Sequence, residues 1–231
     1  MKIFHSTPFA AGLLHVRLLA LGCSLILAGT LEAQNTVLYK GQPRGSKVRI
    51  DGTSTIHDWT VEGELVPGSF EIDSSVQIDP TQKSIGGLKD GKVPAKANVR
   101  IVARTLKSGK TSMDNVMLEA MNADKFPLIE YKLIELTPKG EHQPGTPFQL
   151  EAKGTLTISG VTKTNTMVVN MDRAGPEKLK TTGVANLKMT EFGIKPPAPA
   201  LAIGLIKTGD DVKITFEWLT AIAPKPADAP K

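Results

Sequence analysis

Apolar and polar residues alternate along most of this chain, and the alternation predicts β-strands with one buried face. Between Phe148 and Ile158 every second residue is apolar or glycine, and the residues between them are polar. The same period of two recurs over 98–104 and 211–218, with shorter examples that begin at Val48, Phe70, Ile129 and Met167. A weaker, more polar strand is expected over 179–189. Successive side chains of a strand point to opposite faces, so this pattern is typical of antiparallel sheets with one wet side.

One segment, 113–121, has the spacing of a helix instead of a strand. Ser112 or Thr111 could cap its start, and Pro127 lies beyond its end. With one helix at most, the strands cannot lie between helical layers. Closing the sheet into a barrel hides every edge and buries one face of each strand. A two-sheet sandwich satisfies the same alternation. The apolar positions of the helix are Met113, Val116, Met117, Ala120 and Met121.

The first 33 residues have the features of a secretory signal peptide. A basic region ends at Arg17, the uncharged apolar run 18–31 follows, and Ala33 is a suitable residue before a cleavage site. The apolar run is shorter than the roughly 20 residues that span a bilayer. A lipoprotein signal is the alternative because of Cys23, but no separate apolar region precedes this cysteine.

The rest of the chain is expected to form a single domain without disulfides. Removal of the signal leaves 198 of the 231 residues and takes away the only cysteine. That length suits one barrel or sandwich. We predict a linker over 34–45, a β-barrel over 46–221 and a disordered Pro/Ala tail over 222–231, with loops near 79–96, 138–147 and 195–208. The formal net charge of +5 comes from interspersed residues, so no nucleic-acid partner is expected. No further segment is apolar enough to cross a membrane.

The sequence predicts no catalytic residue and no metal site. Of the histidines His57 and His142, the first is followed by Asp58, but neighbours in a strand point to opposite faces and zinc needs three or four ligands. The segment Gly86–Lys92 has the spacing of a phosphate-binding loop, yet Val93 replaces the required Ser or Thr. No serine lies in a nucleophile elbow. We therefore expect a protein that is not an enzyme.

The composition of the apolar faces leaves room for a cavity. Aromatic residues make up only 5% of the chain, and the inner positions carry mainly Val, Ile, Leu, Met and Ala. Small barrels are either plugged by side chains or hold one ligand, and interiors normally pack densely. Methionines fill irregular gaps and also line adaptable apolar surfaces, so a packed core stays an alternative.

Three stretches of the chain together form a distinctive pattern: the helix at 113–121 followed by Phe126–Tyr131, then Gly154–Lys163, and finally Phe192–Ile194. Through these stretches, and over 46–220 as a whole, the chain resembles the YceI-like family of exported, lipocalin-like barrels that bind polyisoprenoid lipids. The resemblance implies an extended antiparallel β-barrel of about eight strands, with a long apolar tunnel partly covered by the helix.

We therefore expect a periplasmic or secreted carrier that holds an amphiphile with a long apolar chain, such as a polyisoprenoid or an isoprenoid quinone. Beyond such a bound lipid, no cofactor is predicted. Polar groups at the barrel mouth would orient the headgroup, with His57 and Trp59 as candidates. Side chains expected to line the tunnel, with the two methionines as an adaptable lid, are Ile50, Ile72, Ile101, Met117, Met121, Tyr131, Leu156 and Phe216.

The alternative function is a ligand-free, packed β-domain that acts as an envelope interaction or adhesion module. Its interface would be an exposed apolar patch over 196–206. A homodimer is compatible with either function.

Overall fold

The computed structural model describes residues 35–198 and 206–224, and these form a β-barrel with one α-helix. The predicted signal peptide and most of the predicted tail lie outside the described residues. None of the helices in the described part is long and apolar enough to span a membrane. The helical elements are η1 (Ala103–Thr105), α1 (Thr111–Ala120) and η2 (Met189–Phe192). The strands are β1 (Thr36–Gly41), β2 (Lys47–Ser54), β3 (Trp59–Gly63), β4 (Gly68–Asp73), β5 (Ala95–Val102), β6 (Leu128–Pro138), β7 (Phe148–Ile158), β8 (Val161–Arg173), β9 (Lys178–Lys188) and β10 (Thr208–Ile222).

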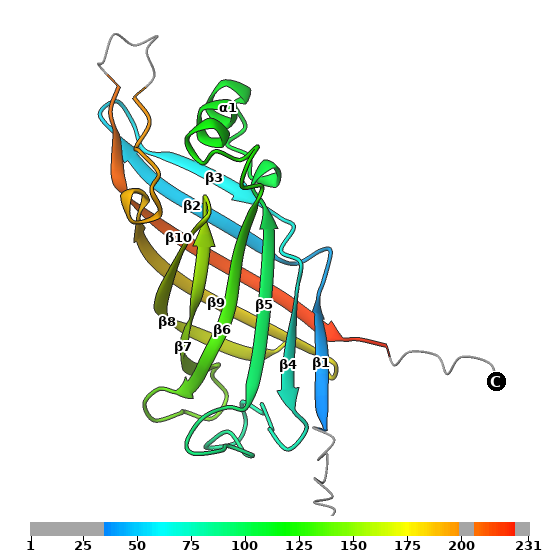
Figure 1. Cartoon of the computed structure of the whole chain (residues 1–231). Coiled ribbons are helices and arrows are strands. Elements are labelled where there is room, and N and C mark those ends of the chain that lie inside the picture. The colour runs from blue at the N-terminus through cyan, green and yellow to red at the C-terminus, as the bar shows by residue number, and fades with distance from the viewer. Residues whose placement is uncertain (1–34, 199–205, 225–231) are drawn as a thin grey trace, which may run out of the picture. The chain divides into compact units, whose positions relative to one another are not determined.

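Eight antiparallel strands close into a ring, and two further strands extend it (Figure 1). The ring runs β1-β4-β5-β6-β7-β8-β9-β10 and closes where β10 pairs with β1, for example Tyr39 with Ile222. The hairpin β2–β3 is added along the first part of β10, where Ile214 pairs with Ile50. Helix α1 lies at the same end of the barrel as β3 (Figure 1). The prediction of a lipocalin-like barrel with one short helix is therefore confirmed.

The inner face of the barrel carries the core, as the alternation predicts. Along the first part of β7, buried and exposed residues alternate strictly, and Leu150 is fully buried. At the end remote from α1, Leu150 belongs to a cluster that includes Phe70, Phe148 and Met171. Nearby, the Trp218 indole Nε1 donates a hydrogen bond to the Val66 carbonyl at 2.9 Å. These residues belong to the larger of the two buried hydrophobic clusters in the described part of the chain.

Four local predictions need correction. The segment 34–45, expected to be a linker, contains β1, because Val37 and Tyr39 alternate over too short a stretch to stand out. The strand expected from Phe70, whose apolar phase continues at Val76 and Ile78, ends at Asp73, where a turn begins, so it forms only β4. His57 and Asp58 lie in the turn between β2 and β3 rather than in a strand. Neither Thr111 nor Ser112 caps α1, because the N-cap residue is Lys110.

Candidate functional site

A cavity of about 580 Å³ lies in the barrel interior and extends from α1 to Phe70, Met171 and Trp218. Its lining comes from α1 and from the inner faces of β2 to β10. Most of the lining side chains are aliphatic or thioether groups, including Val99, Leu133, Ala152, Met167 and Ile214. Since a small barrel can hold one ligand in such a space, the arrangement can take up an apolar chain of moderate length.

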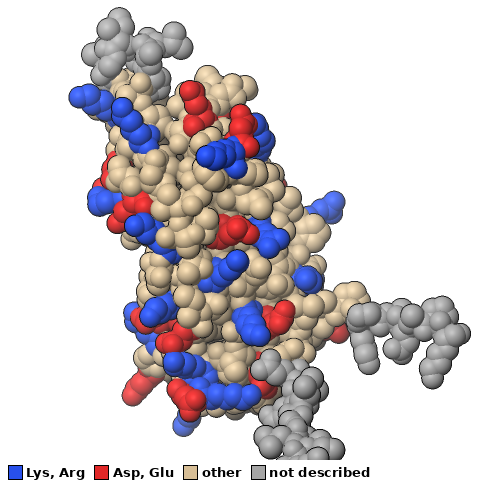
Figure 2. Space-filling view, in the orientation of Figure 1, with Lys and Arg blue, Asp and Glu red and all other residues tan. Residues whose placement is uncertain are grey.

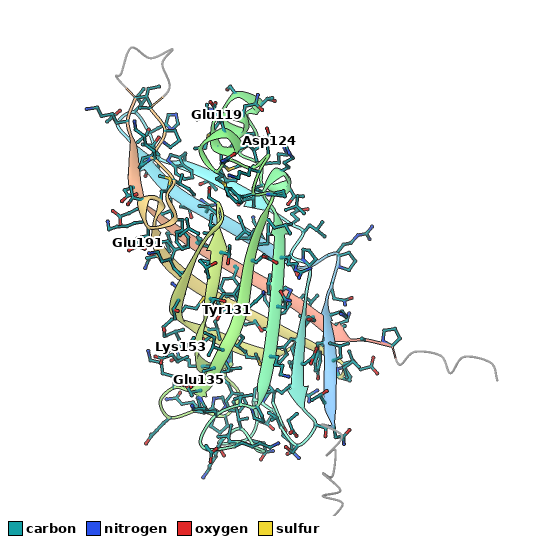
Figure 3. All side chains as sticks on the ribbon, in the orientation of Figure 1. Glu119, Asp124, Tyr131, Glu135, Lys153 and Glu191 are labelled. Atoms are coloured by element: carbon teal, nitrogen blue, oxygen red, sulfur yellow. The ribbon has the colours of Figure 1, made fainter. Side chains whose placement is uncertain are left out.

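Tyr131 forms part of the cavity wall and covers Gly154 of the adjacent strand. A Cβ at Gly154 would lie 2.5 Å from both Cζ and Oη of Tyr131, so only glycine leaves room for the ring in this position. The Tyr131 hydroxyl is buried and has no hydrogen-bond partner in the described part of the chain. Burial raises the pKa of Tyr131 to about 12, because loss of water disfavours the phenolate. In Figure 3 this residue lies at mid-height on the barrel, between Glu119 on α1 and Glu135 near the opposite end.

Helix α1 covers the cavity and is fixed at both of its ends. Its N-cap is Lys110, whose side chain makes no capping bond. Instead, the Asp114 carboxylate accepts hydrogen bonds from the Ser108 backbone N–H and the Ser108 hydroxyl, each at 2.7 Å. These bonds hold the pKa of Asp114 below its usual range. At the other end, the Ser159 hydroxyl donates to the Met121 carbonyl at 2.7 Å.

The turn between β2 and β3 forms one rim of the cavity. Trp59 lies over Gly52, where a Cβ would meet the indole at 2.1 Å, and its Nε1 donates to the Thr53 carbonyl at 3.0 Å. His57 is exposed, and its Nδ1 lies 2.8 Å from the Asp58 carbonyl oxygen. Among the described residues His57 belongs to no group of side chains that could hold a metal ion.

Nine of the ten residues predicted for the site line this cavity. They comprise the mouth residues His57 and Trp59 and seven predicted tunnel residues: Ile50, Ile101, Met117, Met121, Tyr131, Leu156 and Phe216. Ile72 is buried in the same cluster as Phe70 and Met171, which line the cavity, but it does not itself belong to the lining.

Sequence reasoning missed several residues that line the same space. Val99, Met167, Ala185 and Val212 have the inward phase of their strands and could have been found from the alternation. Asn165 also lines the cavity. Its polar side chain gave no signal, because apolar character was the criterion.

Charged side chains lie mainly on the outside of the barrel. Figure 2 shows basic and acidic residues interspersed over one face. Several form ion pairs on the surface, such as Lys92 with Glu135 at 2.6 Å. Of the described residues, the charged ones that reach the cavity are Lys110 and Lys188, and no carboxylate lines it. Lys188 is paired with Asp211 at 2.7 Å, which raises the pKa of the lysine.

The described residues contain no group of three or more His, Cys, Asp or Glu side chains that could hold a metal ion. What this cavity offers is apolar surface, together with isolated hydroxyl, amide and ammonium groups. Such groups can bind and orient a molecule.

The chain therefore forms a closed antiparallel β-barrel with a largely apolar cavity in its interior. The model of the YceI-like domain matches residues 39–219, and the chain belongs to this family. Among solved structures it is similar to BcnA of Burkholderia cenocepacia, with 17% identity and a TM-score of 0.57, over 78% of this chain and 98% of that one. It is also similar to a polyisoprenoid binding domain from Saccharophagus degradans implicated in plant cell wall breakdown. That match has 10% identity and a TM-score of 0.59, over 81% of this chain and 99% of the other. No curated protein matches the chain significantly.

Proposed function

We propose that this protein is an exported carrier that holds an amphiphile with a long apolar chain, a polyisoprenoid or an isoprenoid quinone, inside the barrel. The observation that carries the proposal is the apolar cavity of about 580 Å³ beneath α1. Membership of the YceI-like family and the similarity to a polyisoprenoid binding domain support the choice of ligand class. Export to the periplasm or the exterior is supported by the signal-like pattern of residues 1–33.

Binding would be driven by removal of the apolar chain from water. Each buried methylene contributes about 0.8 kcal/mol, so a chain of ten carbons or so can supply affinity without a strong polar contact. The methionines Met113, Met117 and Met121 supply flexible side chains over the cavity, which suits a ligand with several conformations. We propose binding without catalysis, since the site offers no pair of groups placed for proton transfer.

The alternative, a packed β-domain without a ligand, is opposed by the cavity itself. Interiors normally have few voids larger than a water molecule. A space of about 580 Å³ would be costly in a domain with no ligand to fill it.

The direct test is extraction of the purified protein with organic solvent, followed by mass spectrometry of the extract. We expect an isoprenoid lipid in proportion to the protein. Ala97, which lines the cavity, provides a blocking variant: Ala97→Phe should reduce the recovered lipid to about one tenth or less. The adjacent exposed Lys96 provides the control, because Lys96→Phe adds the same ring outside. Equal lipid recovery from both variants, or none from the wild type, would contradict the proposal.

A further inference from the structure

The barrel wall has a break between β8 and β9. These two strands pair only from Val169 with Gly183 to Arg173 with Leu179. The remaining part of β8, 161–168, pairs with β7 alone, and the part 184–188 of β9 pairs with β10 alone. The two strands diverge toward the end of the barrel that carries α1 (Figure 1).

Side chains close the upper limit of this break, and the cavity lining reaches both of its edges further down. At the upper limit, Phe192 and Ile194, on and just after η2, pack in one cluster with Leu187 and Ile158. Below this cluster, the cavity reaches both strand edges, at Asn165 and Met167 on β8 and at Ala185 on β9. The opening is therefore framed by the η2 cluster above and the β8–β9 ladder below.

The inward-facing positions of β8 become polar where the wall is broken. Residues opposite each other in an antiparallel ladder point to the same face. Lys163 pairs with Leu156 and Asn165 with Gly154, so both have the inward phase of Met167 and Val169. Lys163 is nevertheless exposed and Asn165 half-buried, whereas Val169, within the paired part, is buried. Water thus reaches the inner face of β8 through the break.

Lys163 offers an unneutralised positive charge at this opening. Within the described part of the chain it forms no ion pair, whereas Lys188 on the opposite edge is paired with Asp211. Asn165, one inward position further along β8, lines the cavity directly.

We propose that the break between β8 and β9 is a lateral opening that receives the anionic headgroup of the bound amphiphile. Lys163 would supply the charge, Asn165 a hydrogen-bond donor, and the tail would lie in the cavity. This inference rests on the proposed function and moves the headgroup from the rim at His57 and Trp59 to the side of the barrel. The shared chemistry is a phosphate or carboxylate group on an apolar chain.

The test compares farnesyl phosphate with farnesol, which share the tail and differ in charge. Binding to the full chain is measured by displacement of the uncharged fluorescent probe N-phenyl-naphthylamine. We expect Lys163→Met to weaken the binding of farnesyl phosphate by about 3- to 10-fold and to leave the binding of farnesol unchanged. This factor lies between the values for an exposed ion pair and for a charge-assisted hydrogen bond. The matched control is Lys153→Met, which removes an exposed lysine on the outer face of β7 (Figure 3). This control should change the binding of neither ligand.

The outcomes separate the two proposals. If the wild type binds farnesol and farnesyl phosphate but Lys163→Met affects both equally, or neither, the lateral site is wrong and the carrier function stands. If the wild type binds neither, both proposals fail. Excess inorganic phosphate should not displace farnesyl phosphate, since the tail supplies most of the binding energy; displacement would indicate a site for free anions instead.

Discussion

Replacing Tyr131 with phenylalanine is expected to stabilise the empty protein. The Tyr131 hydroxyl is buried and lacks a hydrogen-bond partner in the described part of the chain. A buried polar group left unsatisfied costs about 1–3 kcal/mol. The variant keeps the ring that covers Gly154 and loses only the oxygen. We therefore expect its free energy of unfolding at neutral pH to exceed that of the wild type by about 1 kcal/mol.

The same hydroxyl predicts how the difference changes with pH. Burial raises the Tyr131 pKa from 10.0 to about 12 in the folded state, so the unfolded chain releases this proton first. Since the folded state then binds more protons than the unfolded state, wild-type stability falls between these two pKa values. The slope is about 1.4 kcal/mol per pH unit. At about pH 11, one unit above the unfolded pKa, the loss specific to Tyr131 is therefore about 1 kcal/mol after allowance for its partial exposure, and Tyr131→Phe should escape it.

Urea unfolding followed by tryptophan fluorescence, at about pH 7 and about pH 11, measures both effects. Tyr39→Phe is the matched control, because Tyr39 is the other tyrosine of the chain and is buried outside the cavity lining. This control should keep the alkaline loss of stability, since Tyr131 is still present. A Tyr131→Phe variant less stable than the wild type, or an advantage that does not grow at high pH, would refute the reasoning.

Two further variants test the contacts that shape the site. Gly154→Ala should lower the free energy of unfolding by about 2–3 kcal/mol, because the new Cβ would lie 2.5 Å from the Tyr131 ring. The control in the same urea titration is Gly86→Ala, whose Cβ would meet no atom closer than 3.7 Å. Asp114→Ala should cost about 1–2 kcal/mol at neutral pH by removing the acceptor of two Ser108 hydrogen bonds. Because the folded-state pKa of Asp114 is lowered, the wild type loses this contribution as the pH falls through that pKa. The gap between wild type and Asp114→Ala should therefore close in acid, and a constant gap would contradict this role of the carboxylate.

Strand patterning predicted the fold well where the alternation was long. The period of two covers all of β7 and residues 211–218 of β10, and the structure places the apolar residues of these two stretches inside. Strands β3 and β1 were not predicted, because each is too short for an alternation of period two to be recognised. The start of α1 was wrong for another reason. Thr111 and Ser112 are good capping residues in isolation, but Ser108 bonds to Asp114 and fixes the start of the helix without them.

The candidate site was predictable in its inward-facing residues and not in its position along the barrel. Ile50 and Ile72 have equivalent phases in their strands, yet Ile50 lines the cavity and Ile72 does not. Alternation states which face a side chain occupies, but it carries no information on height along the barrel. That height depends on how the strands are staggered, which long-range pairing decides.

Irregularities in the alternation deserve the same weight as the alternation itself. On the inner face of β8, the apolar series from Met171 to Met167 gives way to Asn165 and Lys163. A buried, unpaired lysine would be costly, so a charged residue in the inward phase indicates that water reaches that position. The strand pairing gives the physical cause, because β9 leaves β8 at this height. An inward-pointing charge also protects an unpaired edge from pairing with another chain. A polar interruption in an otherwise apolar inward phase thus marks where a barrel wall opens, and in this chain it lies where the cavity can be reached from the side.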